Sequence, residues 1–110
     1  MSLDVKRLLM EFERTLRDTN KAIINPEIAV LKVADLEPVL AMVARARAAY
    51  LKSLIELADN CPDGLPNENQ IAELKKRRVT YDELLSASQA LQTAIERGYL
   101  DVGATPTLVD

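Results

Sequence analysis

Residues 35–60 read DLEPVLAMVARARAAYLKSLIELADN, and this stretch decides the fold. At about 100° per residue, its apolar side chains fall on one arc of a helix. They are Leu36, Leu40, Val43, Tyr50, Leu51, Leu54, Leu57 and Ala58. Asp35 is a good N-cap, and Pro38 falls in the first turn, where a missing backbone N–H removes no helical hydrogen bond. The pattern predicts a long amphipathic helix over residues 36–59.

Arg47 lies in the middle of that apolar arc, which is an unusual position for a permanently charged side chain. A guanidinium keeps its charge at any ordinary pH, so its burial requires a carboxylate, carbonyl groups or a bound anion. Three interpretations stay open: the side chain extends along the helix to solvent, it forms a buried ion pair, or it holds a small acidic ligand. If the first two long helices are antiparallel neighbours, Glu13 is the predicted partner of Arg47, within a chain or across a dimer.

A first helix is predicted over residues 3–24, with Ser2 as its N-cap. Its apolar stripe repeats at helical spacing through Val5, Leu8, Leu9, Phe12, Leu16, Thr19 and Ile23. Pro26 ends the helix, because the residue before a proline disfavours helical backbone angles. The connector over residues 25–34 combines an Asn-Pro helix start with an alternating apolar pattern, so a short helical turn and an extended segment are both open.

A third helix is predicted over residues 68–97. Asn67 and Gln70 have the spacing of a capping box and open it. A second box, Thr80 with Glu83, leaves open a break near the middle, but no glycine or proline intervenes and we favour one continuous helix. A heptad reading gives two core rows, one with Ile71, Arg78, Leu85 and Gln92, the other with Leu74, Tyr81, Ser88 and Ile95.

The chain of 110 residues has room for a single helical domain, which we assign to residues 1–100. Gly98 fits the position that ends the last helix. Residues 101–110 are small and polar and predict a flexible C-terminal tail. Hydrophobic residues make up 48% and charged residues 28% of the chain, which is an ordinary globular balance.

The net charge of −3 weighs against attraction to nucleic acid or to an anionic membrane. Cys61 is the only cysteine, so no intramolecular disulfide is possible and nothing indicates an oxidising compartment. The N-terminus lacks the apolar region of a signal peptide, and no run reaches the roughly 18 apolar residues of a membrane span. We therefore expect a soluble protein of the cytoplasm that does not bind membranes.

Catalytic chemistry has few residues to use, because the sequence contains no histidine. Cys61 has no basic neighbour in the sequence that would make it a nucleophile. The Glu-x-x-His motif of metal-binding helical bundles is absent, and the three glycines are isolated rather than gathered in a phosphate loop. We expect no catalytic residue, no metal and no cofactor, and a protein that is not an enzyme.

Lys75, Lys76, Arg77 and Arg78 form the one basic cluster. Such a cluster can contact phosphates, and a turn near Val79 would make it part of a helix-turn-helix. Four successive residues point in different directions around a helix, however, and do not form a one-sided basic stripe. Nucleic-acid binding is therefore the alternative function, and a solvated or partner-facing charge run is the favoured interpretation.

Three long helices with one apolar stripe each predict an all-α, antiparallel bundle. The last helix is longer than its neighbours, and a second copy would cover its extra turns, which predicts a homodimer. Polar residues at stripe positions suit an interface that specifies register: Arg47, Glu13, Arg78, Ser88 and Gln92 are the interface or buried polar candidates. The expected function is a non-catalytic α-helical interaction protein, an adaptor or accessory subunit with a protein partner.

Overall fold

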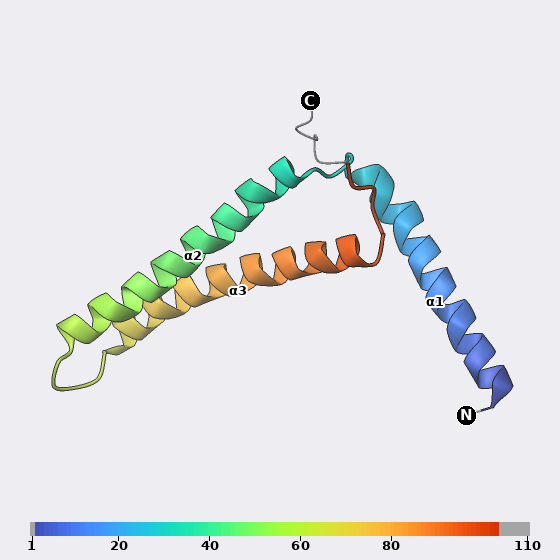
Figure 1. The fold of residues 1–110 in the computed structure, drawn as a ribbon. Coiled ribbons are helices and arrows are strands. Elements are labelled where there is room, and N and C mark those ends of the chain that lie inside the picture. The colour runs from blue at the N-terminus through green and yellow to red at the C-terminus, as the bar shows by residue number, and fades with distance from the viewer. Residues whose placement is uncertain (1, 104–110) are drawn as a thin grey trace. The chain divides into compact units, whose positions relative to one another are not determined.

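The computed structural model describes residues 2–103, and most of them lie in helices. In chain order these are α1 (Leu3–Ile24), the 3₁₀ helix η1 (Asn25–Glu27), α2 (Val33–Asn60) and α3 (Glu68–Glu96), labelled in Figure 1. The predicted all-α class with three long helices is confirmed. The chain divides into two compact units, Glu37–Ala90 and the two end segments Met1–Leu36 with Leu91–Asp110, and each is described by itself.

The first unit is a helical hairpin in which α2 packs against α3 (Figure 1). Residues 61–67 join the two helices, which run antiparallel. The Tyr50 and Tyr81 ring centroids lie 6.1 Å apart and mark the register of the pair. The antiparallel pair in the structure is therefore α2 with α3, whereas the sequence argument for Glu13 and Arg47 assumed a pair of the first two long helices. Because α1 belongs to the other unit, a bundle of all three helices stays a prediction, as does the dimer.

The seam of the hairpin follows a regular repeat of three and four residues on both helices. On α2 it consists of Val39, Val43, Ala46, Tyr50, Ser53 and Leu57, of which Val43 is 6% exposed and the others are half-buried. On α3 the half-buried seam residues are Gln70, Leu74, Tyr81, Leu84 and Ser88. The predicted row that contains Leu74, Tyr81 and Ser88 therefore faces α2.

The second predicted row on α3 faces the seam only in part. Ile71 is exposed while its neighbour Gln70 is half-buried, Arg78 is exposed, and Leu84 and Leu85 are both half-buried. Together with the row of Tyr81, either the residues of the predicted row or their preceding neighbours give a repeat of three and four residues. The sequence of α3 alone therefore does not choose between them. The position of α2 makes the choice, which is a tertiary effect.

The predicted start of α3 is confirmed in atomic detail. The backbone N–H of Gln70 donates to Asn67 Oδ1 at 2.8 Å, and the N–H of Asn67 donates to Gln70 Oε1 at 2.8 Å, which closes the capping box. α3 is one continuous helix. The hydroxyl of Thr80 donates to the Lys76 carbonyl at 3.1 Å and is therefore used inside this helix instead of capping a new one.

α2 begins at Val33, earlier than predicted. Asp35 caps it from inside the first turn, because its carboxylate accepts the backbone N–H of Lys32 at 2.9 Å. Pro38 consequently lies beyond the first turn, and the Ala34 carbonyl lacks its usual helical donor. None of the helices over residues 2–103 combines the length and the apolar character needed to cross a membrane.

In the second unit, Ser2 caps α1 as predicted, and its Oγ accepts the N–H of Val5 at 3.2 Å. The end of α3 is closed by Gly98, which has a φ of +71°. The Tyr99 N–H reaches the Ala94 carbonyl at 2.9 Å, the long-range bond of a Schellman motif, and turns the chain away from the helix axis. Leu31, Tyr99 and Leu100 form the buried core of this unit.

The connector contains both of the conformations that the sequence left open. The turn η1 comes first, and the chain then extends to Leu31, which pairs with Val102 in an isolated parallel bridge. The N–H of Leu31 donates to the Asp101 carbonyl at 3.0 Å, and the N–H of Gly103 donates to the Leu31 carbonyl at 2.7 Å. Residues 101–103, which the sequence assigns to a flexible tail, are therefore bonded to the connector. The remainder of that predicted tail, residues 104–110, lies outside the described residues.

Candidate interaction surfaces

Arg47 lies on the exposed surface of the hairpin, held against an aromatic side chain. Its Nε donates to the Tyr81 hydroxyl at 2.9 Å, and its guanidinium carbon lies 5.2 Å from the centroid of the Tyr81 ring. Tyr81 in turn lies beside Tyr50. In the single chain Arg47 is not buried, which agrees with the interpretation in which its side chain extends to solvent along the helix. A partner or ligand that covers it stays a prediction.

Arg47 belongs to a row that runs beside the seam. On each helix, the residue after every second seam position lies beside the seam. These residues share one face of the hairpin, which we name the arginine face. It consists of Leu40, Arg47 and Leu54 from α2 and Ile71, Arg78 and Leu85 from α3, of which Leu85 is half-buried and the others are exposed. Leu40, Leu54 and Ile71 are 61%, 51% and 48% exposed. This face contains a pocket of about 200 Å³, which is lined by Tyr50, Ile71, Leu74, Lys75 and Arg78.

The four basic residues 75–78 have different surroundings in the structure. Lys76 lies 3.2 Å from a carboxylate oxygen of Glu73, and Arg78 lies 3.5 Å from one of Asp82. All four basic residues are exposed. Lys75 and Arg78 line the pocket of the arginine face, whereas Lys76 and Arg77 do not. The alternative of nucleic-acid binding through all four stays a prediction.

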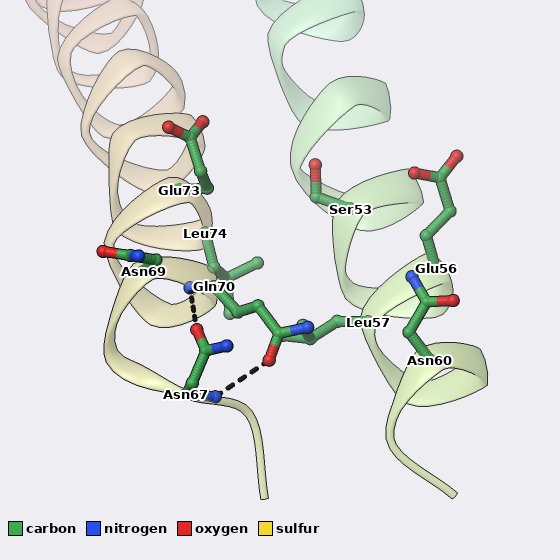
Figure 2. A pocket seen from close by; sticks show the side chains of 9 residues that line it. All are labelled: Ser53, Glu56, Leu57, Asn60, Asn67, Asn69, Gln70, Glu73 and Leu74. Atoms are coloured by element: carbon green, nitrogen blue, oxygen red, sulfur yellow. Dashed lines mark hydrogen bonds between the residues drawn. The ribbon is translucent and has the colours of Figure 1, made fainter.

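A second, more polar pocket of about 340 Å³ lies at the closed end of the hairpin (Figure 2). Its lining consists of Ser53, Glu56, Leu57, Asn60, Asn67, Asn69, Gln70, Glu73 and Leu74. Two of these amides form the capping box of α3. Glu56 lies 3.8 Å from Lys52. The half-buried Cys61 lies 3.7 Å from Gln70 Oε1, as a residue tucked under a helix end. The sequence pattern did not indicate this pocket, because its amides come from two helices.

Ser88 and Gln92 bond within α3. The hydroxyl of Ser88 donates to the Leu85 carbonyl at 2.8 Å, and the Gln92 amide donates to Glu96 at 3.0 Å. Ser88 is half-buried on the seam and Gln92 is exposed. A seam serine that bonds to its own helix leaves no polar group unsatisfied, so the hairpin tolerates it.

Glu13 is exposed on α1 and lines a charged pocket of about 420 Å³. The other lining residues, all in the same unit, are Leu16, Arg17, Glu96, Arg97 and Tyr99. The surroundings of Glu13 within its unit therefore include two arginines. Its predicted pairing with Arg47 joins residues of the two units, and it stays a prediction.

The apolar stripe of α1 is exposed along most of its length. Val5, Leu8, Leu9, Phe12 and Ile23 are all exposed, and Phe12 shows 61% of its surface. Leu16, which belongs to the stripe, is half-buried, and so are Asn20 and Ile24, which follow it at intervals of four residues. The rest of the unit therefore shields one edge of α1 and leaves the centre of its stripe open.

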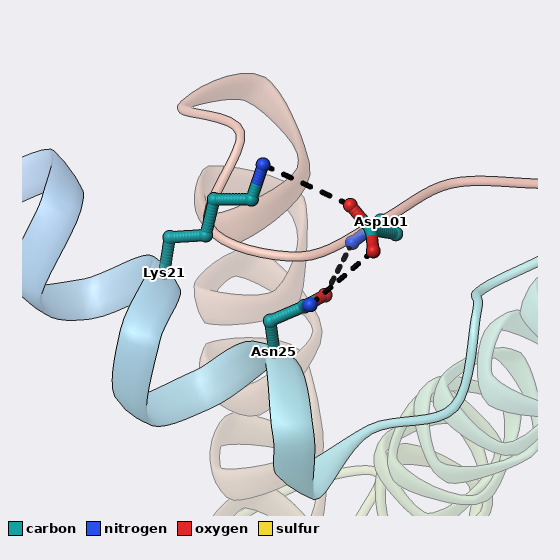
Figure 3. A network of polar contacts seen from close by, with 3 residues as sticks. All are labelled: Lys21, Asn25 and Asp101. Atoms are coloured by element: carbon teal, nitrogen blue, oxygen red, sulfur yellow. Dashed lines mark hydrogen bonds and ion pairs between the residues drawn. The ribbon is translucent and has the colours of Figure 1, made fainter.

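A network of polar contacts ties the end of α1 to the C-terminal segment (Figure 3). The Asp101 N–H donates to Asn25 Oδ1 at 2.8 Å, and the Asn25 amide donates to the Asp101 carboxylate at 3.2 Å. Lys21 Nζ lies 3.8 Å from the same carboxylate. We name these three residues the clasp. These contacts join its members to one another, so the clasp holds the end of α1 against the C-terminal segment.

Comparison with protein-family models, with curated proteins and with solved structures gives no match. Among residues 2–103 no three His, Cys, Asp or Glu side chains converge in a way that would hold a metal ion. The arginine face and the stripe of α1 both carry apolar side chains that are regularly spaced and largely exposed. They are the candidate sites.

Proposed function

We propose that the protein is a non-catalytic α-helical interaction protein, an adaptor or accessory subunit of the cytoplasm that forms a homodimer through α1. One observation supports this function above the others: α1 carries its apolar residues in a heptad row and exposes them. The row runs through Val5, Leu9, Phe12, Leu16, Thr19 and Ile23, of which Leu16 is half-buried and Val5, Leu9, Phe12 and Ile23 are the exposed apolar members. A contiguous apolar stripe on an otherwise charged helix is typical of a protein–protein interface.

The chemistry of α1 suits pairing with its own copy. A helix of 22 residues is about 33 Å long, which is enough for three heptads of contact. Burying a leucine or phenylalanine side chain contributes roughly 1.5–3 kcal/mol. Two copies of the stripe related by a two-fold axis would each cover the other, which is the commonest arrangement of soluble oligomers.

The experiment is a measurement of molar mass by sedimentation equilibrium at micromolar concentrations. We expect twice the chain mass of 12.2 kDa for the natural sequence and the mass of a single chain for Leu9→Glu. Met10→Glu is the matched control, since Met10 is an exposed apolar residue next in the chain on a different face of α1. A single-chain mass for the natural sequence, or equal behaviour of the two variants, would contradict the dimer.

A further inference from the structure

The arginine face of the hairpin combines exposed apolar side chains with two arginines, which is the pattern of a groove that binds a charged helix. Exposed leucine and isoleucine side chains lie toward its ends, and Arg47 and Arg78 lie between them. With Tyr50 beside Tyr81, Arg78 is level with the turn of α2 that contains Ser53. At a rise of 1.5 Å per residue, the two arginines are therefore about 10 Å apart along the hairpin axis.

We propose that the arginine face binds an amphipathic helix of another protein, whose apolar stripe is flanked by carboxylates about seven residues apart. The apolar stripe would cover Leu40, Leu54 and Ile71, and the carboxylates would meet Arg47 and Arg78. This inference rests on the proposed function and names the chemistry of a partner. The helix α1, which carries the proposed dimer interface, belongs to the other unit.

A helix fits this face because two packed helices present a groove between their ridges, and a third helix lies in it at a small crossing angle. Apolar anchors repeat along such a ligand at helical spacing. The pocket of about 200 Å³ beside Tyr50, Ile71 and Arg78 can receive one of these anchors. One heptad of the ligand spans about 10 Å, so carboxylates in successive heptads match the spacing of the two arginines.

The cations select an acidic ligand. The bond to Tyr81 uses one of the five N–H donors of Arg47. A guanidinium with free donors binds a carboxylate by two parallel hydrogen bonds. Arg78 contacts Asp82, but both side chains are about half exposed, and an exposed ion pair of this kind is weak enough to exchange for a new partner. Lys75 adds a third positive charge at the pocket.

Charge also distinguishes this face from the other candidates. A second copy that used the same face would bring Arg47 and Arg78 against the same cations, and like charges across an interface disfavour association. The polar pocket at the closed end of the hairpin carries Glu56 and Glu73 instead. An acidic helix is therefore directed to the arginine face and away from the closed-end pocket.

The experiment measures binding of two synthetic helices to the full chain by fluorescence anisotropy. The first probe is a 21-residue peptide with leucine at the core heptad positions and glutamate at the flanking positions, and the second replaces each glutamate by lysine. We expect the glutamate peptide to bind about tenfold or more tightly than the lysine peptide. Equal affinities, or no binding of either peptide, would overturn the proposal.

Two variants locate the site. Arg47→Glu with Arg78→Glu is expected to reverse the preference, so that the lysine peptide binds more tightly. Arg47→Gln with Arg78→Gln, which is milder toward folding, is expected to abolish the preference. The matched control is Arg45→Glu with Lys76→Glu, which makes the same change of charge on outward positions of the same helices. A loss in the control equal to that in the first variant would show non-specific attraction and overturn the proposal.

A further variant separates this partner from the chain itself. If the glutamate peptide binds the Leu9→Glu variant but not the natural sequence, α1 of this protein itself occupies the face, and the proposal of a different partner is wrong. If the natural sequence is a monomer and still discriminates between the peptides, the dimer is wrong and the arginine face stands. The two proposals therefore fail separately.

Discussion

At the scale of the residue, Arg47 shows how a charged side chain can occupy an apolar arc without burial. Its guanidinium lies over Tyr81 of α3, which supplies both a hydroxyl acceptor and a π face. The sequence marked Arg47 as an anomaly because carboxylates and anions are the usual partners of a buried cation. The tyrosine was missed, since its hydroxyl has no charge for a sequence pattern to reveal.

Replacement of Tyr81 by phenylalanine tests the hydroxyl alone. The ring and its stacking on Tyr50 remain, so only the bond to Arg47 is lost. Because that bond is exposed, we expect the free energy of unfolding to fall by about 0.5–1 kcal/mol, at the weak end for a hydrogen bond. Urea denaturation measures the change. Tyr50→Phe is the matched control, and an equal loss in both variants would show that the bond contributes nothing specific.

At the scale of the element, the helix ends follow from local sequence. The capping box of α3 and the glycine that closes the helix both involve residues within a few positions of each other, and both were predicted. The start of α2 was placed too late, because Asp35 can cap a helix either from the N-cap or from its first turn. The local sequence thus indicates that a helix begins in this region, and the conformation of the connector determines the residue at which it begins.

Replacement of Asn67 by alanine removes the side-chain half of the box. The Gln70 N–H loses its acceptor, and we expect a loss of about 0.5–2 kcal/mol in the free energy of unfolding. Thermal and urea melts followed by circular dichroism measure it. Asn69→Ala is the control, because Asn69 lies in the first turn of α3 and shares the same pocket lining without a part in the box. A larger loss in the control would contradict this role for the box.

The clasp is also an element of the fold, and Asp101 is its shared member. Asp101→Ala removes the acceptor for Asn25 and Lys21 while leaving the backbone bonds of residue 101 in place. We expect a loss of about 1 kcal/mol, the usual net worth of one exposed hydrogen bond with a weak ion pair. Differential scanning calorimetry would detect this as a drop of about 4–8 °C in melting temperature. Asp63→Ala, in the loop between α2 and α3, should leave the melting temperature unchanged.

At the scale of the whole molecule, the sequence predicts the number and class of helices and predicts less well which side chains face each other. The apolar arc of α2 proves to be two rows, because Val43, Tyr50 and Leu57 enter the seam while Leu40 and Leu54 remain exposed. An arc that wide does not indicate which half meets α3. The arginine face follows from that division and could not be recognised until the seam was known.

The clasp and the bridge of Leu31 with Val102 were not predictable for a different reason. Asn25 and Asp101 are 76 positions apart, and neither has a neighbour that signals the other. Periodicity and capping rules report on residues a few positions apart. Contacts between distant residues depend on how the intervening helices are placed, which the hydrophobic pattern does not encode.

This separation has a consequence for the order in which the chain folds. The hairpin closes through a loop of a few residues, whereas the clasp must close a loop of 76 positions, and the entropic penalty of closure rises with loop length. Helix pairing is thus expected to precede the clasp during folding, as local contacts generally form faster than distant ones. We expect unfolding to follow the reverse order, so that the clasp opens and frees the connector while α2 and α3 are still paired. A polypeptide emerging from the ribosome would accordingly complete its hairpin before the last residues that lock its N-terminal helix have been synthesised.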